Sequence, residues 1–447
     1  MRRPVLYLPI ETKARELYGK VLLAARAVER GWQVVLGPQE TVRESLRNGP
    51  PGAFIEISIP GSKAAKLADY QRRGHRTANL CEESIVYYDA LDYCRRKVGE
   101  ASIEHIDVML VVGPANEVDL RRQRPTAASK IAVTGNPRFD TLAPAGRVIY
   151  EAAAAALRAR FGRFLLINTN FMRTNHFKRG PDEIIARLRR ENAIVDDAHA
   201  VAVRKQYTYK GEQMDGLQPV LAAIQASRTF DRIVLRPHPS ENHDTWRAWA
   251  ATHGIDVIYE GSANAWILAA DAFLHTGCTT GLEGVLLDVP VASYQPVRGH
   301  ELLNQADAVS EPFTTAEEFL ALAETWRGVA PADRRGYLGG QRRRLGSLIA
   351  SVEPPMAVDR ILDALERFDL PATEVPAVGR RNANPIAAVA SSLRGRFKVM
   401  RGAYHRQKFP GLEVEDMAGP VSAWLGSGVL QRAPEMKQLP DGTWLLW

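Results

Sequence analysis

The chain has 447 residues, of which 45% are hydrophobic and 24% charged, so a soluble globular protein of two domains is expected rather than one compact core. Its net charge of +7 favours an acidic partner, and nucleic acid, an anionic membrane surface and a phosphorylated substrate all fit that charge. No apolar run approaches the ~20 residues that cross a bilayer, and three scattered cysteines favour a reducing cytoplasm.

The first 149 residues alternate short apolar runs with helical stretches. The expected strands are VLYLPI, WQVVLG, AFIEISI, RTANL, IDVMLVVG and KIAVTG, and the expected helices cover residues 15–30, 63–73 and 117–122. Apolar strands separated by helices indicate a parallel sheet covered on both faces. Residues 1–149 are therefore predicted to form a Rossmann-like domain. VLYLPI is interpreted as its first strand rather than a signal sequence, because Glu11 and Lys13 end the apolar run.

A second cycle of the same kind opens with the helix YEAAAAALRARFG at residues 150–162. Its expected strands are FLLIN, DRIVLRP, IDVIY, DAFLHTG and PVASY, and its helices lie near residues 181–228, 245–252, 264–270 and 315–368 and at TTGLEGVLLD. Residues 150–368 are predicted to form a second Rossmann-like domain, which makes the fold class α/β. Two such domains imply a cleft between them, because open α/β sheets bind ligands beyond the carboxyl ends of their strands.

The last segment, residues 369–447, is basic. Between Pro376 and Leu412 it has no acid and eight cations: Arg380, Arg381, Arg394, Arg396, Lys398, Arg401, Arg406 and Lys408. One interpretation is a solvated linker and surface helix. The other is peripheral attraction to the anionic inner face of the cytoplasmic membrane, where each basic residue contributes about 1 kcal/mol.

Three strand ends in the second domain carry small polar residues where a ligand is expected. They lie in INTNFMRTN, RPHP and HTGCTTGLEG, and the residues concerned are Thr169, Asn170, Arg173, Arg236, His238, Pro239, Thr276, Gly277, Thr279 and Thr280. Thr279 and Thr280 fall at a predicted helix start, and such starts commonly bind anions. His275, at the end of its strand, is expected to be a packed core residue.

RPHPSENHD does not indicate a metal site, because His238 and His243 have no third ligand at a recognisable spacing. Residues 240–244 are expected to cap the next helix.

In the first domain, RTANL is followed by CEES, which places Glu82 and Glu83 at a carboxyl end. Adjacent carboxylates raise one another's pKa, which suits one of them to proton abstraction. The alternative is that they cap a helix beginning near Val86.

Further residues of the first domain are also candidates. Glu11, Lys13 and Arg15 follow the first strand together with Glu16, and catalysis and helix capping both explain this group. Arg138, in TGNPRFD, is predicted to position a ligand or to join the two domains.

Taken in order, YLPIETKARE, CEES, VTGNPRFD, INTNF, RPHP, TGCTTGLEG and KFPG resemble the bacterial surface-carbohydrate biosynthesis proteins. That family is related to the capsule and lipopolysaccharide Kdo transferases and to bacterial sialyltransferases. The resemblance covers roughly residues 4–415 and implies a GT-B glycosyltransferase whose C-terminal tail, residues 369–447, crosses back to an acceptor-side first domain. It also implies that the second domain binds a CMP-activated 2-keto acid sugar, Kdo or another nonulosonate.

The resemblance assigns roles to individual residues. His238 and Pro239 are expected to bind the CMP phosphate, Thr279 and Thr280 to contact the nucleotide, and Glu283 to hold the ribose. The acidic pair supplies the general base in the sialyltransferase relatives, but CEES departs from their pattern. Cys81 stands where an acid is common and Ser84 where glycine is common, so the base is either Glu82 or Glu83, and loss of activity is also open.

No Asp-x-Asp triplet occurs in the sequence, so neither a metal nor another cofactor is expected. The predicted partners are a nucleotide-sugar donor and a glycan or lipid-linked glycan acceptor, and nucleic acid is not among them, because the basic residues form no recognisable motif. Two rival interpretations remain: a UDP-sugar GT-B enzyme, either 2-epimerase or transferase, and a non-catalytic GT-B-like protein of a polysaccharide assembly complex.

Overall fold

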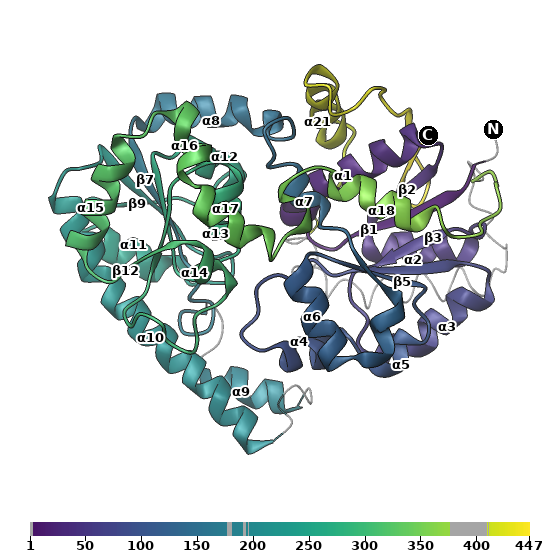
Figure 1. The fold of residues 1–447 in the computed structure, drawn as a ribbon, viewed down its shortest axis with the longest axis horizontal. Coiled ribbons are helices and arrows are strands. Elements are labelled where there is room, and N and C mark those ends of the chain that lie inside the picture. The colour runs from purple at the N-terminus through teal and green to yellow at the C-terminus, as the bar shows by residue number, and fades with distance from the viewer. Residues whose placement is uncertain (1–2, 177–180, 191–193, 195, 376–408, 410) are drawn as a thin grey trace. The chain divides into compact units, whose positions relative to one another are not determined.

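The computed structural model describes residues 3–176, 181–190, 194, 196–375, 409 and 411–447, which form two compact units (Figure 1). Unit 1 consists of Met1–Ser84, Ala90–Ile149 and Ile349–Trp447, and unit 2 of Ile85–Asp89 and Tyr150–Leu348. The eight cations of the predicted membrane-contacting tail, residues 380–408, lie outside the described residues.

Unit 1 is built on an eight-stranded sheet with the order β13-β14-β2-β1-β3-β4-β5-β6, in which β1 to β6 are parallel. Its strands are β1 Val5–Ile10, β2 Gln33–Pro38, β3 Ala53–Glu56, β4 Arg76–Leu80, β5 Val108–Val111, β6 Ile131–Val133, β13 Met436–Gln438 and β14 Trp444–Leu446. Its helices are α1 Lys13–Glu29, α2 Gln39–Asn48, α3 Ala64–Arg72, α4 Ala90–Lys97, α5 Glu100–Ile103, α6 Pro114–Gln123, α7 Pro137–Asp140, α18 Ala357–Leu365 and α21 Glu415–Gly426.

Apolar side chains cover both faces of this sheet. Leu6 and Leu8 belong to the core that contains residues of α1, α18 and α21. Tyr7, which points to the other face, lies edge-on to His75, and Phe54 packs on Tyr70 of α3. Because successive residues of a strand face opposite ways, an unbroken apolar run is what a parallel sheet covered on both sides requires. The prediction of a parallel α/β sheet is confirmed.

The end of the chain belongs to unit 1. Val358, Ile361 and Leu362 of α18 lie in the core of unit 1, so the expectation that helices up to residue 368 complete the second domain is wrong. Asp140 holds this segment in place, since its two carboxylate oxygens accept the N–H groups of Ala357 and Val358, each at 2.9 Å. Further on, β14 pairs antiparallel with β2.

Unit 2 contains a six-stranded parallel sheet with the order β12-β11-β10-β7-β8-β9. Its strands are β7 Phe164–Asn168, β8 Arg232–Arg236, β9 Asp256–Val257, β10 Ala272–His275, β11 Val291–Tyr294 and β12 Glu311–Phe313. Its helices are α8 Val148–Phe161, α9 Pro181–Arg190, α10 Asp197–Ala226, α11 His243–Ala250, α12 Ala263–Ala269, α13 Thr280–Leu286, α14 Gln305–Val309, α15 Ala316–Arg327, α16 Arg334–Tyr337 and α17 Gly339–Gly346.

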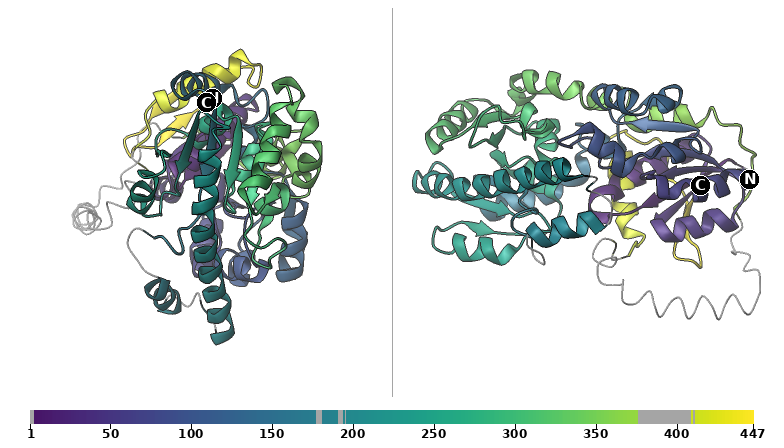
Figure 2. Two further views of the ribbon diagram at one scale, coloured as in Figure 1. Left: turned by 90° about the vertical axis from the view of Figure 1, so that its left-hand side faces the viewer. Right: turned by 90° about the horizontal axis from the view of Figure 1, so that it is seen from below.

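Helix α10 is the longest element of unit 2. At 30 residues it extends for about 45 Å, and α9 lies beside its first turns (Figure 2). Its C-terminal half packs Leu217, Leu221 and Ile224 on the sheet. In the part of the chain that the structure covers, no helix has both the length and the apolar character needed to cross a membrane.

Candidate functional site

The carboxyl edge of the unit 1 sheet holds a buried ion pair. Glu82 follows β4, and its Oε1 lies 3.2 Å from Nζ of Lys20 in α1, with both side chains at most 2% exposed. Its other oxygen, Oε2, accepts a hydrogen bond of 2.9 Å from Nδ2 of Asn136. Burial raises the pKa of Glu82, but Lys20, Arg15 and Arg138 outweigh it and hold the pKa below its usual range. Glu82 is therefore an ionised carboxylate whose two oxygens both have protein partners.

Glu83 points elsewhere. Its side chain is 47% exposed, lies 3.4 Å from Arg15 and forms a close ion pair with Lys97. Partial burial raises its pKa, but these two cations lower it to about 2. The segment after it is not helical before Ala90, so the alternative that the acidic pair caps a helix near Val86 is wrong.

Of the other candidates of unit 1, Arg15 and Arg138 lie near the acidic pair and Lys13 does not. Arg15 bonds Glu16 at 2.9 Å and lies beside the acidic pair, and Arg138 is buried close to Glu82. Lys13 instead forms an ion pair of 2.7 Å with Asp416 of α21, so it anchors the end of the chain rather than the acidic pair.

Two further acids of this edge are buried: Glu16, which was among the candidates after the first strand, and Glu56, which was not predicted. Glu11 donates its backbone N–H to Glu16, whose pKa is raised by burial and by the nearby Glu82. Glu56, which ends β3, accepts hydrogen bonds from Arg43 at 2.6 Å and Lys63 at 3.0 Å. Carboxylates at the ends of neighbouring parallel strands are the available signal, and AFIEISI carries one.

In unit 2, Glu241 joins two strand-end loops. Its Oε1 accepts hydrogen bonds from Thr169 Oγ1 at 2.8 Å, Phe171 N at 2.9 Å and His238 N at 3.2 Å, and its Oε2 accepts one from Trp246 Nε1 at 2.7 Å. The expectation that residues 240–244 only cap the next helix is therefore incomplete.

The helix cap itself is Asn242, whose Oδ1 accepts the N–H of Asp244. Glu241, one residue earlier, is 2% exposed and fixes the predicted site residue Thr169 to the predicted phosphate loop.

The loop after β10 is joined to the loop after β7. The backbone N–H of Asn170 donates to Thr276 Oγ1 at 2.9 Å, and Nδ2 of Asn170 donates to the carbonyl of Gly277 at 3.0 Å. Gly277 has φ +76°, a conformation that favours glycine, and a Cβ there would lie 2.9 Å from Asn304. Three of the predicted residues thus meet at one point of the sheet edge.

A buried lysine from α10 reaches the same point. Nζ of Lys210 donates to the carbonyl of Thr276 at 2.6 Å and to Gln213 at 2.8 Å, and the side chain is 3% exposed. The prediction missed it. The signal was its spacing, because Lys210 falls on the stripe in which Tyr207, Met214 and Leu217 are buried.

Arg236, a predicted ligand contact, is bonded to the backbone of its own unit. Its guanidinium donates to the carbonyls of Glu260 at 2.6 Å and Gly261 at 3.2 Å, it is 6% exposed, and burial lowers its pKa to about 10. His238 is partly exposed and its Nδ1 accepts the N–H of Ser240, and Pro239 is exposed.

The remaining candidates lie at the start of α13. Thr280 is its first residue, Thr279 precedes it without a side-chain cap, and Glu283 is 7% exposed on the same helix. The predicted helix start is thus confirmed.

His275, the last residue of β10, forms a hydrogen bond with the loop that follows it. It is fully buried, its Nδ1 accepts the N–H of Gly277 at 3.1 Å, and its Nε2 lies 2.8 Å from Ser310 Oγ. Because Nδ1 accepts, the ring proton is on Nε2. Burial lowers the pKa of His275 to about 4, in keeping with a neutral ring. The expectation of a packed core histidine is confirmed.

We expect His275 to make the stability of the protein pH-dependent. Its pKa is about 4 when folded and about 6.5 when unfolded, so its contribution is complete above pH 6.5 and is lost as the pH falls towards 4, by about 3 kcal/mol. His275→Asn keeps an acceptor near Nδ1 but does not titrate. Urea unfolding from pH 4 to 7 should give a flatter profile for this variant than for the wild type or the His253→Asn control. Parallel profiles would contradict the assignment.

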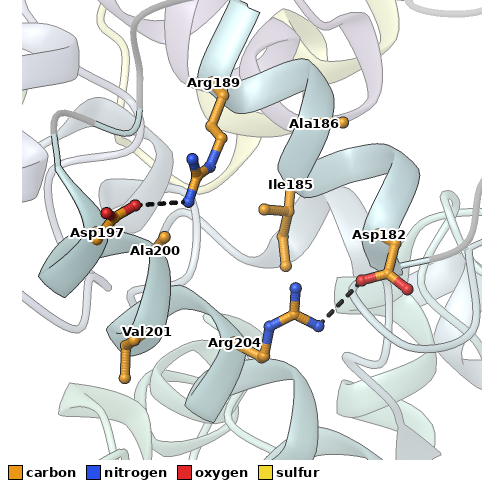
Figure 3. A pocket seen from close by; sticks show the side chains of 8 residues that line it. All are labelled: Asp182, Ile185, Ala186, Arg189, Asp197, Ala200, Val201 and Arg204. Carbon is orange, nitrogen blue, oxygen red and sulfur yellow. Dashed lines mark hydrogen bonds and ion pairs between the residues drawn. The ribbon is translucent and has the colours of Figure 1, made fainter.

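A groove lies away from these loops, between α9 and the start of α10 (Figure 3). Ile185, Ala186, Ala200 and Val201 line it, and the ion pairs Arg189–Asp197 at 2.9 Å and Arg204–Asp182 at 3.0 Å flank it. It contains none of the predicted site residues. Over the described ranges, no three His, Cys, Asp or Glu side chains are grouped to hold a metal ion.

Two Rossmann-like units in succession, with the end of the chain returned to the first, define the GT-B class of α/β proteins. A solved structure assigned as a UDP-N-acetylglucosamine 2-epimerase from Listeria monocytogenes shares this fold. It is 13% identical, the match covers 82% of this chain and 96% of the other, and the TM-score is 0.51. The predicted GT-B fold is thereby confirmed.

Two further solved structures match less closely. The S. aureus MnaA–UDP complex is 11% identical over 82% of this chain and 96% of its own, with a TM-score of 0.46. The wall teichoic acid polymerase TagF is 11% identical over 82% and 89%, with a TM-score of 0.47. No protein-family model and no curated protein matches the chain. None of these three structures is a Kdo transferase or a sialyltransferase, so that predicted kinship stays a prediction.

Proposed function

We propose that this protein is a GT-B enzyme that acts on a nucleotide-activated sugar, and that the nucleotide binds at the carboxyl edge of the unit 2 sheet. The observation that carries the proposal is the meeting of the loops after β7 and β10 around Thr276 and Gly277, with the buried ammonium of Lys210 bonded to the same turn. A cation behind a tight glycine turn is suited to a phosphate group.

A UDP-sugar is the donor that we favour over the CMP-sugar of the motif resemblance. The support is the fold shared with a UDP-N-acetylglucosamine 2-epimerase over 82% of this chain. A sugar diphosphate also carries more negative charge than a CMP linkage, which suits a buried lysine. The reaction is then transfer or 2-epimerisation of the sugar. Binding of a CMP-nonulosonate in place of UDP-sugars would instead favour the CMP-sugar transferase that the motif resemblance implies.

Within unit 1, Glu83 is the acid that we assign to contact the substrate. Arg15 and Lys97 pair with its two oxygens, but its side chain is 47% exposed, whereas the side chain of Glu82 is 2% exposed. With a pKa of about 2, Glu83 is ionised at neutral pH, so it is a better hydrogen-bond acceptor for a sugar hydroxyl than a proton-abstracting base.

Thermal-shift and calorimetric titrations with UDP, UDP-N-acetylglucosamine, CMP, a CMP-nonulosonate and GDP test the proposal. A ligand present at about 100 times its Kd should stabilise the folded chain by about 2.7 kcal/mol. Lys210→Met should weaken UDP binding by about 10-fold or more, because one charge-assisted contact is removed. Lys205→Met is the matched control, since its side chain is 63% exposed on the same helix.

The outcomes separate the candidates. Stabilisation by CMP-sugars alone would overturn the uridine assignment, and no response to any nucleotide would overturn the enzyme class at this site. Binding without release of UDP or epimerised sugar would favour the non-catalytic protein of an assembly complex.

A further inference from the structure

The guanidinium of Arg173 lies over two tyrosine rings in unit 2. Its Cζ is 5.8 Å from the ring centre of Tyr88 and 5.7 Å from that of Tyr207. Arg173 also acts on the Tyr207 hydroxyl: burial raises the pKa of Tyr207, and the positive charge of Arg173 opposes the rise. Cation–π contacts of this kind hold a guanidinium in place.

Arg173 lies beside the proposed nucleotide site. Phe171, two residues before it, donates its backbone N–H to Glu241, and the Phe171 ring centre is 5.8 Å from Nζ of Lys210. Tyr207, which contacts Arg173, stands three residues before Lys210 on α10, so the two cations are held at neighbouring positions of one helix face. Arg173 therefore lies next to the phosphate site rather than inside it.

The second tyrosine comes from the segment Ile85–Asp89, which belongs to unit 2 although it follows the acidic pair in the sequence. The backbone N–H of Tyr87, the residue before Tyr88, donates to Gln305 Oε1 at 3.1 Å. Gln305 is the first residue of α14, so this bond holds the segment against that helix. Two separate parts of the chain are thus folded back to hold one guanidinium.

No aspartate or glutamate among the described residues forms an ion pair with Arg173. Other arginines of the unit do form such pairs, as Arg160, Arg204 and Arg247 show. A half-buried guanidinium fixed by aromatic rings, with no acid against it, presents a planar fork of N–H donors to a carboxylate or phosphate.

We infer that Arg173 binds an anionic group carried by the sugar part of the substrate, a carboxylate or a sugar phosphate, and so selects acidic over neutral sugars. The inference rests on the proposed function, because it places the sugar next to the nucleotide. The competing explanation is a purely structural clamp that holds Ile85–Asp89 in unit 2.

Isothermal titration of the full chain with UDP, UDP-N-acetylglucosamine and UDP-glucuronic acid separates the two explanations. Arg173→Met should weaken UDP-glucuronic acid by about 10- to 100-fold while changing UDP less than about 2-fold, since only the acidic sugar loses a charged partner. Arg173→Lys should recover part of the loss. Arg247→Met, an exposed arginine of α11 paired with Asp244, is the control and should change none of the three.

Equal weakening of all three ligands, or no weakening of the acidic one, would overturn the inference in favour of the structural clamp. Glucuronate, glucose 1-phosphate and inorganic phosphate alone form the second arm, with thermal shift as the readout. If no nucleotide binds at all, the proposed function fails, but a shift by glucuronate or glucose 1-phosphate that Arg173→Met abolishes would still support the anion site. If none of these anions shifts the melting temperature, the anion site is contradicted. If only glucuronate shifts it, the group that Arg173 binds is a carboxylate rather than a phosphate.

Discussion

Lys20→Met is expected to destabilise the protein by about 3 kcal/mol, because it leaves the Glu82 carboxylate buried without its ammonium partner. Glu82 and Lys20 are both almost fully buried, and their charged atoms are 3.2 Å apart. After the substitution, Glu82 keeps the hydrogen bond from Asn136 and the fields of Arg15 and Arg138, which limit the loss. The free energy of unfolding at pH 7, from urea titration, is the measurement.

The double variant Lys20→Met/Glu82→Gln distinguishes a charge effect from a packing effect. If the cost arises from the unpaired carboxylate, removal of both charges should recover about 2 kcal/mol relative to the sum of the single variants. Lys97→Met is the matched control, because it removes the partner of the half-exposed Glu83 and should cost less than about 1 kcal/mol. A loss below 1 kcal/mol for Lys20→Met would show that the buried pair contributes little.

Strands β1 to β8, β10 and β11 were predictable because each contains an apolar run between polar segments, whereas the short strands β12, β13 and β14 were not predicted. FLLIN is β7 residue for residue, and VLYLPI is β1. The placement of α18 was not predictable in the same way. Its apolar face fits either sheet, and the choice depends on Asp140, more than 200 residues earlier, which accepts the first two N–H groups of the helix. Long-range capping of this kind leaves no local pattern.

The candidate site was predictable at the level of loops and not of partners. INTNF, RPHP and TGCTTG do end adjacent strands of one sheet, and Asn170, Thr276 and Gly277 do meet. The charge behind them comes from Lys210 on a 30-residue helix far along the chain. Partners were also not predictable for Arg236, since an arginine at a strand end suggests a ligand contact, and its bonds to the carbonyls of Glu260 and Gly261 leave no local pattern.

Glu241→Ala is expected to cost about 3–5 kcal/mol and to loosen both strand-end loops. Four donors converge on this carboxylate, and three of them, from Thr169, Phe171 and His238, meet at the same oxygen. Alanine leaves these donors without their acceptor, and Thr169, Phe171 and Trp246 are almost fully buried. Chemical denaturation measures the loss, and amide hydrogen exchange at Phe171 and His238 reports on the loops.

Glu241→Gln tests whether the charge or only the shape is needed. Glutamine has one acceptor oxygen and one NH2 group. If the oxygen accepts from the three donors of the β7 and β8 loops, the NH2 group must face Nε1–H of Trp246, and two donors then oppose each other. We expect a cost of about 2 kcal/mol, with nucleotide binding weakened because His238 loses its acceptor when the amide is reversed. Asp244→Asn is the control, since its side chain is 85% exposed and should cost less than about 0.5 kcal/mol. If glutamine is tolerated as well as the control, the charge of Glu241 is not needed, and the connection between the β7 and β8 loops must depend on the hydrogen bonds between Asn175 and Asn242 instead.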